Sequence, residues 1–378
     1  MKKLLLSLAV IAATFTSCSD DDNNNSNNAP AEAVLPDEIT ENMTLNAGTV
    51  YTLMGPVYVK SGVTLTIPAG TRIEGYAEED AEEVSFLAVE TGGKIIAQGT
   101  AENPIVMTSS KANPQPGDWG GLVVCGLAQT NLGTGVSAEV TGLTYGGTNS
   151  ADNSGVYSYI VLEYAGALIN QNAEFNGFTF YAVGSGTTVN NLLAYQGSDD
   201  GFEWFGGSVN ATNLAAIGCQ DDSFDWTEGW NGTVTNLYSD QSVATAFSAD
   251  SRGIEADSNQ NNETQAPISN PTLKNITLIG RNNAAVTSEA GIMLRRGTKG
   301  MIDNVYIANF KSTASGSYAV NFSGTGSQAH FTANPVTKVK LVNNTADTNI
   351  AAGISIDDNA TGAGNGATAP TWMDWMGL

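Results

Sequence analysis

The sequence is poor in charged residues and contains a single histidine, His330. Asp, Glu, Lys and Arg make up 14% of 378 residues, about half of the roughly 25% that is usual, and 38 acidic residues face 15 basic ones. This balance argues against nucleic acid as a partner, because phosphate binding requires clustered Lys and Arg. One histidine also makes a His-rich zinc site or a Ser-His-Asp triad hard to build.

Long apolar runs are also scarce. Residues 4–15 form one apolar stretch, which follows Lys2 and Lys3 and precedes small residues. This pattern predicts a secretory signal peptide over residues 1–17, which is too short to span a bilayer as a stable helix. No other apolar run approaches ~20 residues, so we expect lipid to be the only membrane attachment.

The end of this leader, Phe15-Thr16-Ser17-Cys18, resembles a bacterial lipobox. The resemblance implies that Cys18 is acylated, for example with palmitate, and becomes the mature N-terminus. Residues 19–22 form an acidic run that resembles the export signal of Bacteroidetes-type surface lipoproteins. We therefore expect a disordered Asp/Asn-rich tether over residues 18–34 and an outer-membrane protein exposed at the cell surface. Ordinary secretion and a tether that faces the periplasm are the alternatives.

Cleavage after residue 17 removes Lys2 and Lys3 and no acidic residue. The mature chain then carries 38 acidic and 13 basic residues, a formal charge of −25. Such a charge suits an exposed surface on which like charges repel, and it attracts divalent cations.

Glycine, with 42 residues, is abundant, and the body of the chain contains internal repeats. Residues 201–204 read Gly-Phe-Glu-Trp and residues 223–226 read Ser-Phe-Asp-Trp, each after an acidic pair at 199–200 and 221–222. Looser copies begin at residues 177, 253 and 291. A second series places asparagine before an apolar strand, at Asn191, Asn213, Asn236, Asn275 and Asn304. Two series in phase predict stacked coils in which the asparagine amides bond to one another and adopt left-handed torsions.

Alternation within the repeats predicts an inward aromatic series that includes Phe202, Trp204, Phe224 and Trp226. A short unit cannot bury its apolar face alone, but stacked coils share a continuous core. These repeats resemble the coils of right-handed parallel β-helix proteins of the pectate-lyase-like superfamily, over residues 45–360. An immunoglobulin-like sandwich is the alternative fold, but it would not explain why the two series keep their phase.

The resemblance implies an all-β, right-handed, single-stranded parallel β-helix of about ten to twelve coils. We expect this domain to cover residues 35–378 and the protein to be a monomer. Residues 35–48 are expected to cap one end, and the tail that contains Trp372 and Trp375 to fold over the other end or over a flank. Cys125 and Cys219 would lie about four turns of ~4.8 Å apart, too far for a disulfide, so we expect two unpaired, buried thiols.

The acidic residues of the repeats form a stripe along the stacked coils. Asp199, Asp200 and Glu203 lie one coil from Asp221, Asp222 and Asp225, so equivalent carboxylates should sit ~5 Å apart. Unscreened like charges at this distance repel by about 1 kcal/mol in water. We expect a cation, a basic neighbour, raised pKa values or hydrogen bonds from turn amides to offset this repulsion. Oxygen ligands favour Ca²⁺, so these six residues are the predicted metal ligands. The alternative is that Asp199 and Asp221 are turn residues that cap backbone amides.

Catalysis is a further possibility for the stripe. Pectate lyases of the superfamily use Ca²⁺ with a basic residue, and Gln220-Asp221-Asp222 looks like one motif of polygalacturonases, whose Gly-His-Gly and Arg-Ile-Lys motifs this chain lacks. The candidates for catalysis are Asp221, Asp222, Asp225 and Arg252. Arg252 could act as a base only with a heavily depressed pKa.

Other residues are candidates for ligand binding. Glu255, Asp257 and Arg295 continue the stripe, whereas exposed sugar contacts are expected from the aromatic residues Tyr181, Phe205, Trp230 and Tyr238. The sequence leaves three functions open. The first is a non-catalytic module that binds a glycan or another surface polymer, assisted by Ca²⁺; the second is a polysaccharide lyase or glycoside hydrolase; the third is a purely structural rod.

Overall fold

The computed structural model describes residues 30–140, 142–171, 173–283, 290–312 and 317–378. The predicted signal peptide, Cys18 and most of the predicted tether lie outside the described residues. Residues 31–378 form one compact unit, which contains every strand and helix described below. No helix of this described part is long and apolar enough to cross a bilayer.

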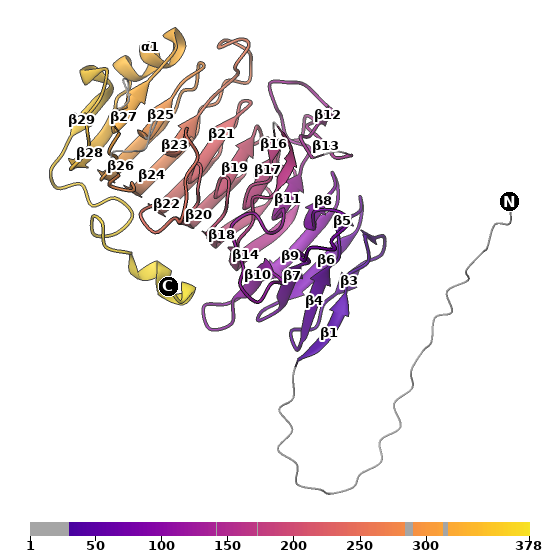
Figure 1. Ribbon diagram of the computed structural model, residues 1–378. Helices are drawn as coiled ribbons and strands as arrows, with labels where there is room; N and C mark the ends of the chain where they lie inside the picture. Colours follow the sequence, from indigo (N-terminus) through magenta and orange to yellow (C-terminus); the bar gives the residue numbers. More distant parts are fainter. Residues whose placement is uncertain (1–29, 141, 172, 284–289, 313–316) are drawn as a thin grey trace, which may run out of the picture. The chain divides into compact units, whose positions relative to one another are not determined.

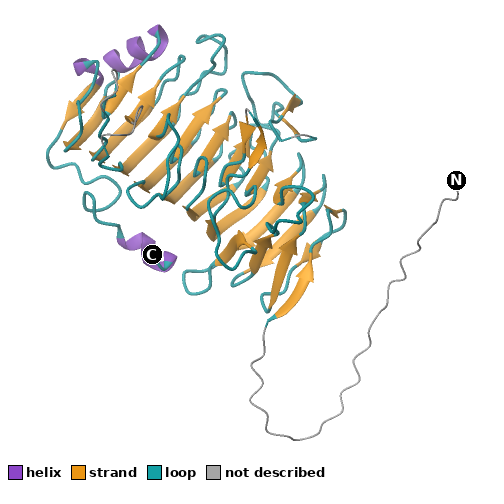
Figure 2. Cartoon of the chain, viewed as in Figure 1, coloured by secondary structure: helices purple, strands orange, loops and turns teal. Residues whose placement is uncertain are grey.

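Two long parallel sheets run the length of this unit (Figures 1 and 2). The strands of the larger sheet are β1 (Ala31–Val34), β3 (Met43–Thr44), β4 (Thr49–Leu53), β6 (Thr64–Pro68), β7 (Arg72–Gly75), β9 (Lys94–Gln98), β10 (Ile105–Ser109), β14 (Gly155–Glu163), β18 (Thr188–Tyr195), β20 (Asn210–Ile217), β22 (Thr233–Asp240), β24 (Thr272–Ile279), β26 (Met301–Ala308), β28 (Val336–Val342) and β29 (Ile354–Ile356). The strands of the smaller sheet, which carries the acidic stripe, are β2 (Glu38–Ile39), β5 (Pro56–Val59), β8 (Phe86–Val89), β11 (Leu122–Cys125), β17 (Phe178–Tyr181), β19 (Phe202–Phe205), β21 (Phe224–Thr227), β23 (Arg252–Ala256), β25 (Ala290–Leu294) and β27 (Val320–Phe322).

Outside these sheets, the described residues form two hairpins and three helices. The hairpins are β12 (Val136–Ser137) with β13 (Thr144–Tyr145) and β15 (Leu168–Asn170) with β16 (Ala173–Glu174). The helices are α1 (Thr325–Ala333) and two 3₁₀ turns, Ala351–Gly353 and Thr371–Met376.

Equivalent residues of successive coils are paired in register, as the repeats predict. Phe202 pairs with Phe224 and Trp204 with Trp226 across parallel strands, and all four side chains are buried in one core. The rings of Phe202 and Phe224 stack with centroids 5.6 Å apart. The right-handed parallel β-helix is therefore confirmed, with ten strands in the smaller sheet.

The predicted asparagine series forms a ladder of side-chain amides. Asn213 donates from Nδ2 to Oδ1 of Asn191 at 2.9 Å, and Asn236, Asn275 and Asn304 repeat the bond at 2.7–2.9 Å. All five residues have φ between 52° and 66°. Each lies within a strand of the larger sheet rather than at a separate turn, and its left-handed torsion bends that strand.

The ends of the solenoid differ from the expectation in two places. Strand β1 pairs with β4 in parallel, so ordered structure begins four residues before the predicted domain boundary. Residues 35–48 contain β2 and β3, which belong to the first coil and do not form a separate cap.

The C-terminal tail lies on a flank of the larger sheet. Met373 and Met376 pack there, and Trp375 meets the ring of Tyr159 at 5.2 Å. The flank alternative for the tail is therefore confirmed. Cys125 and Cys219 are unpaired and buried, as expected, and burial raises the pKa of the Cys219 thiol to about 12.

Candidate functional site

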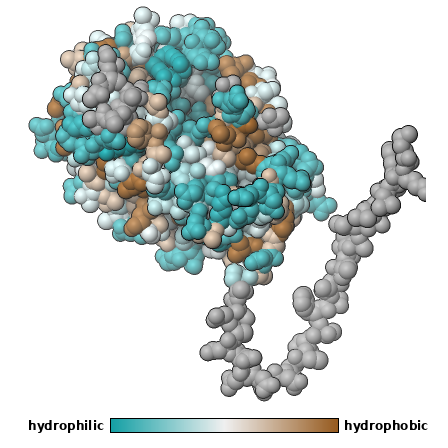
Figure 3. All heavy atoms as spheres, in the orientation of Figure 1, coloured by the Kyte–Doolittle hydropathy of each residue, from teal (hydrophilic) through white to brown (hydrophobic). Residues whose placement is uncertain are grey.

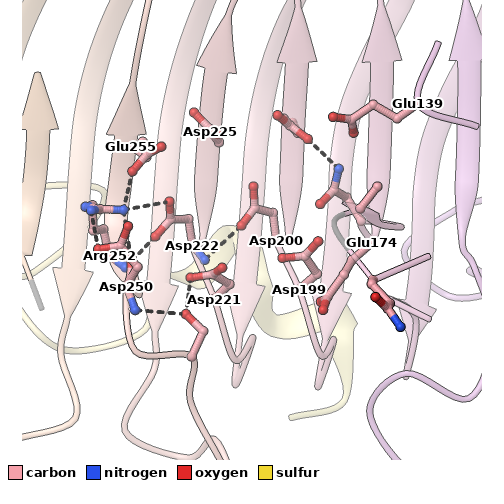
Figure 4. A pocket seen from close by; sticks show the side chains of 15 residues that line it. Glu139, Glu174, Asp199, Asp200, Asp221, Asp222, Asp225, Asp250, Arg252 and Glu255 are labelled. Carbon is pink, nitrogen blue, oxygen red and sulfur yellow. Dashed lines mark hydrogen bonds and ion pairs between the residues drawn. The ribbon is translucent and has the colours of Figure 1, made fainter. Parts of the chain in front are cut away.

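The predicted acidic stripe lies at the start and on the outward face of three neighbouring strands, β19, β21 and β23. Glu203, Asp225 and Glu255 occupy paired outward positions of these strands. Asp199-Asp200 and Asp221-Asp222 occupy the corners that precede β19 and β21. The structure thus brings together all six predicted metal ligands (Figure 4).

These side chains line a cleft of about 460 Å³, which we call the acidic cleft. Three further acidic residues complete it: Glu139 from the loop between β12 and β13, Glu174 of β16, and Asp250 from the segment before β23. The face in Figure 3 shows small hydrophobic patches between hydrophilic atoms. The acidic cleft contrasts with such a mixed surface because ten of its fifteen lining residues are acidic and one, Arg252, is basic.

Part of the stripe has a structural role. The backbone N–H of Asp222 donates to Asp200 Oδ1 at 2.9 Å, and the backbone N–H of Arg252 donates to Asp222 Oδ1. Each carboxylate therefore caps the equivalent corner of the next coil. The turn-capping alternative named Asp199 and Asp221, whereas these caps belong to their neighbours Asp200 and Asp222. Asp221 Oδ1 instead accepts from the Ser248 hydroxyl at 2.5 Å, and the second oxygen of Asp222 lies 3.8 Å from Arg252 Nη1.

Arginines neutralise one side of the acidic cleft. Arg252 is paired with Asp250 at 2.5 Å and with Glu255. Arg295 is paired with Glu255 and, at 2.7 Å, with Asp257. These pairs are the basic neighbours that the sequence allows as an alternative to a cation, and they make Glu255, Asp257 and Arg295 parts of one ion-pair network.

The other side of the acidic cleft lacks such compensation. Within the described ranges, no Lys or Arg forms an ion pair with Asp199, Asp200, Glu203 or Asp225. Burial and then the neighbouring carboxylates raise the pKa of all four well above its ordinary value. Glu203 accepts a hydrogen bond from Asn176 Nδ2 at 2.6 Å, which opposes that rise in its pKa.

The donor set fits a hard divalent cation. Asp199, Asp200 and Asp221 each offer an oxygen within 4.8 Å of the others, and so do Asp200, Asp222 and Asp225. Two oxygens bound at about 2.4 Å to one Ca²⁺ lie at most about 4.8 Å apart, so either triad could share an ion. Asp225 Oδ1 is buried and has no hydrogen-bond partner in the described part of the chain, so it is open to such a ligand.

A comparison with family models decides the family. The model of the pectate-lyase like beta helix domain matches residues 37–376, nearly the whole solenoid. The chain belongs to this family. Searches of curated proteins and of solved structures gave no match. Membership in this β-helix family supports a carbohydrate-related function, and binding and catalysis are both compatible with it.

The surroundings of Arg252 do not supply the depressed pKa that a role as a base would require. Burial lowers the pKa of Arg252, but the carboxylates of Asp222, Glu255 and Asp250 raise it further, so the net shift is upward. The pKa of Arg295 is raised for the same reason. These surroundings favour the protonated guanidinium and so oppose a role of either arginine as the base of a lyase, because a base must first be deprotonated.

The prediction of exposed aromatic sugar contacts is wrong, because all four side chains are buried. Tyr181 and Phe205 face outward from the solenoid, but hairpin β12–β13 covers them, and the Tyr181 ring lies 4.7 Å from that of Tyr145. Trp230 is fully buried in the core and stacks on Trp204 at 4.7 Å. Tyr238 lies under the C-terminal tail and donates its hydroxyl to the Ala367 carbonyl at 3.0 Å.

Sequence reasoning missed Glu139, Glu174 and Asn176. All three precede the repeats that carry the stripe, and two of them belong to loops inserted between coils. Inserted loops do not follow the repeat, so periodicity gives no signal for them. In the sequence, the one available signal for these residues is that the inserted loops carry acidic side chains.

Proposed function

We propose that the protein is a non-catalytic module that binds a glycan or another surface polymer in the acidic cleft. The observation that carries the proposal is the continuity of the cleft across three coils, with walls supplied by inserted loops. Such a surface offers many hydrogen-bond acceptors to sugar hydroxyls at once. Fixed strands hold these acceptors, so little conformational entropy is lost on binding.

Ca²⁺ assists this binding in our proposal. The triad of Asp199, Asp200 and Asp221 and the triad that extends to Asp225 would hold the ion through carboxylate oxygens. A bound cation would relieve the repulsion that raises the carboxyl pKa values, and it would offer open coordination positions to sugar hydroxyls. The protein's own residues would fix the corner backbone on both sides of the ion.

We also propose that the module acts as a monomer at the cell surface. Acyl chains on Cys18 would hold it in the outer membrane, and the Asp/Asn-rich tether would separate the solenoid from the lipid. A glycan-binding cleft on such a tether could retain polymer near the cell.

Retention of the protein on immobilised glycans, with Ca²⁺ and with chelator, tests the proposal. We expect retention without cleavage, and we expect calorimetry to detect Ca²⁺ uptake with a rise in melting temperature. If the protein took up no Ca²⁺ and its melting temperature did not shift on chelation, the proposal that Ca²⁺ assists binding would be contradicted. Absence of retention on acidic, neutral and basic glycans alike would leave the purely structural rod.

A polysaccharide lyase or glycoside hydrolase is the second candidate. It is favoured by the raised pKa values of Asp200 and Asp222, because a carboxyl that keeps its proton can serve as a general acid. Release of unsaturated or reducing ends that vanishes in an Asp221→Asn, Asp222→Asn variant would establish the enzyme. Asp222→Asn keeps an oxygen for the Arg252 N–H and Asp221→Asn keeps one for the Ser248 hydroxyl, so loss of activity would not simply report a lost turn.

A further inference from the structure

We propose that the acidic cleft selects a cationic glycan, one whose sugars carry free amino groups. The inference rests on the proposed function and names the class of polymer that this same site takes. It departs from the acidic polymers that a pectate-lyase-like fold brings to mind.

The charge of the cleft favours a cation and disfavours a polyanion. Ten acidic and one basic side chain line it, a formal charge of −9 when every carboxyl is ionised, and one bound Ca²⁺ would then leave −7. Like charges at ~5 Å repel by about 3 kcal/mol at the effective dielectric constant near a protein surface. A polyuronate would therefore need several additional cations, whereas an ammonium group is attracted directly.

Two buried polar atoms of the cleft lack a hydrogen-bond partner among the described residues. Asp225 Oδ1 is an acceptor, and Nε of Arg252, a residue that is 4% exposed, is a donor. A buried group without a partner costs free energy, so each points to a ligand group that completes it. An amino sugar offers both complements, because its ammonium group donates and its hydroxyl oxygens accept.

The uncompensated carboxylates fix where the amine binds. Arginines pair with Glu255 and Asp257, whereas Asp200, Glu203 and Asp225 have no ion-pair partner in the described part of the solenoid. Asp200 is 7% exposed, so a cation beside it is largely shielded from water. A charge-assisted hydrogen bond in such a place is about twice as strong as a neutral one.

The acidic cleft adjoins two further hollows, which together with it form a groove. The acidic cleft shares Glu174 with a hollow that reaches Ser198 and Gln220, before the strands, and it shares Glu203 with a second hollow that reaches Asn259, beyond them. These hollows continue one another along the strand direction. A polymer in these hollows would thus lie parallel to the strands, perpendicular to the axis of the solenoid.

Exposed apolar side chains border this groove. Leu168, 61% exposed, lines the first hollow, and Leu132, 50% exposed, lines the second. Exposed apolar groups around a polar floor are typical of binding grooves. They would contact the apolar faces of the sugar rings, which a purely ionic ligand does not offer.

Calorimetric titration with four hexamers tests the inference: glucosamine, N-acetylglucosamine, galacturonate and lysine. The titrations use the intact mature protein at low salt, below the pKa of the sugar amine, with Ca²⁺ and with chelator. We expect the glucosamine hexamer to bind at least about tenfold more tightly than the other three, since a hydrogen bond to a charged group is worth about that much. Its affinity should fall as salt is added.

The outcomes separate the two proposals. If N-acetylglucosamine or galacturonate binds as well as glucosamine, the inference is overturned and glycan binding stands. If hexalysine binds as well, the cleft recognises charge alone and the inference is again overturned. If no sugar binds, the proposed function itself fails.

A matched pair of variants locates the site. Asp225→Asn removes the charge and keeps the shape, and it should weaken glucosamine binding about tenfold. Asp358→Asn makes the same change in net charge at an exposed aspartate of the C-terminal tail and should leave binding unchanged. Melting curves of both variants confirm the fold first. Equal affinity of the Asp225→Asn variant and the unmodified protein would contradict the assignment.

Discussion

Asp200 shows how one residue can stabilise the fold and strain it at once. Its Oδ1 caps the next corner by accepting the Asp222 N–H at 2.9 Å. Burial and then the charges of Asp199 and Asp222 raise its pKa well above the ordinary value, so the ionised form is disfavoured in the folded protein. A carboxyl whose folded pKa is raised contributes stability below its unfolded pKa of about 3.9, and that contribution is lost as pH rises through the folded value.

The first prediction concerns pH. With chelator present, Asp200→Asn should raise the free energy of unfolding at pH 8 by about 1–3 kcal/mol and change it little at pH 4. The asparagine oxygen keeps the cap and removes the charge. Denaturant unfolding across this range measures the effect, with Asp358→Asn as the exposed control. If the free energy of unfolding changed with pH in parallel for the variant and the unmodified protein, the ionised Asp200 would not be repelled by its neighbouring carboxylates.

The second prediction concerns the asparagine ladder. Asn236 donates to Asn213, accepts from Asn275 and has a φ of 66°. Asn236→Ala loses both hydrogen bonds. It also leaves in the left-handed region a residue whose side chain cannot form a local hydrogen bond, so the substitution should lower the free energy of unfolding by about 2–4 kcal/mol. Asn236→Gly adopts the same positive φ without strain, so it should lower the free energy of unfolding by less. Chemical unfolding can resolve this difference. Equal losses would mean that the torsion has no part in the effect.

At the scale of elements, strands that follow the repeat were predictable and inserted segments were not. The pairing of Glu203 with Asp225 follows from alternation and a fixed step. The cover over Tyr181 does not, because hairpin β12–β13 belongs to no repeat and its position depends on tertiary packing. A buried outward aromatic and an exposed one look the same in the sequence, and this explains the wrong sugar-contact prediction.

The third prediction concerns the C-terminal tail. Met373 is 5% exposed against the flank of the larger sheet, so Met373→Ala should lower the free energy of unfolding by about 2–5 kcal/mol. Met301, 63% exposed, provides the control, and Met301→Ala should change it by less than about 0.5 kcal/mol. Glycan retention should survive in both variants because the tail packs on the larger sheet and the cleft on the smaller. Loss of retention with Met373→Ala alone would couple the two faces.

At the scale of the whole molecule, the attachment to the membrane rests on the sequence alone. The fourth prediction is that a palmitate analogue labels the protein in cells and that Cys18→Ala abolishes the label and releases the protein from the membrane fraction. Cys125→Ala, at a buried thiol, is the control and should keep the label. Persistent membrane association of the Cys18→Ala protein would point to another anchor.

The central claim is that the carboxylates stacked by the β-helix form the binding site. A diffraction map of crystals grown with the glucosamine hexamer tests this claim most directly. The account predicts sugar density in the acidic cleft, over the outward face of β19, β21 and β23, with an amino nitrogen at about 2.7–2.9 Å from the Asp225 carboxylate. Density on another face, or an empty cleft under conditions in which the hexamer binds in solution, would contradict it.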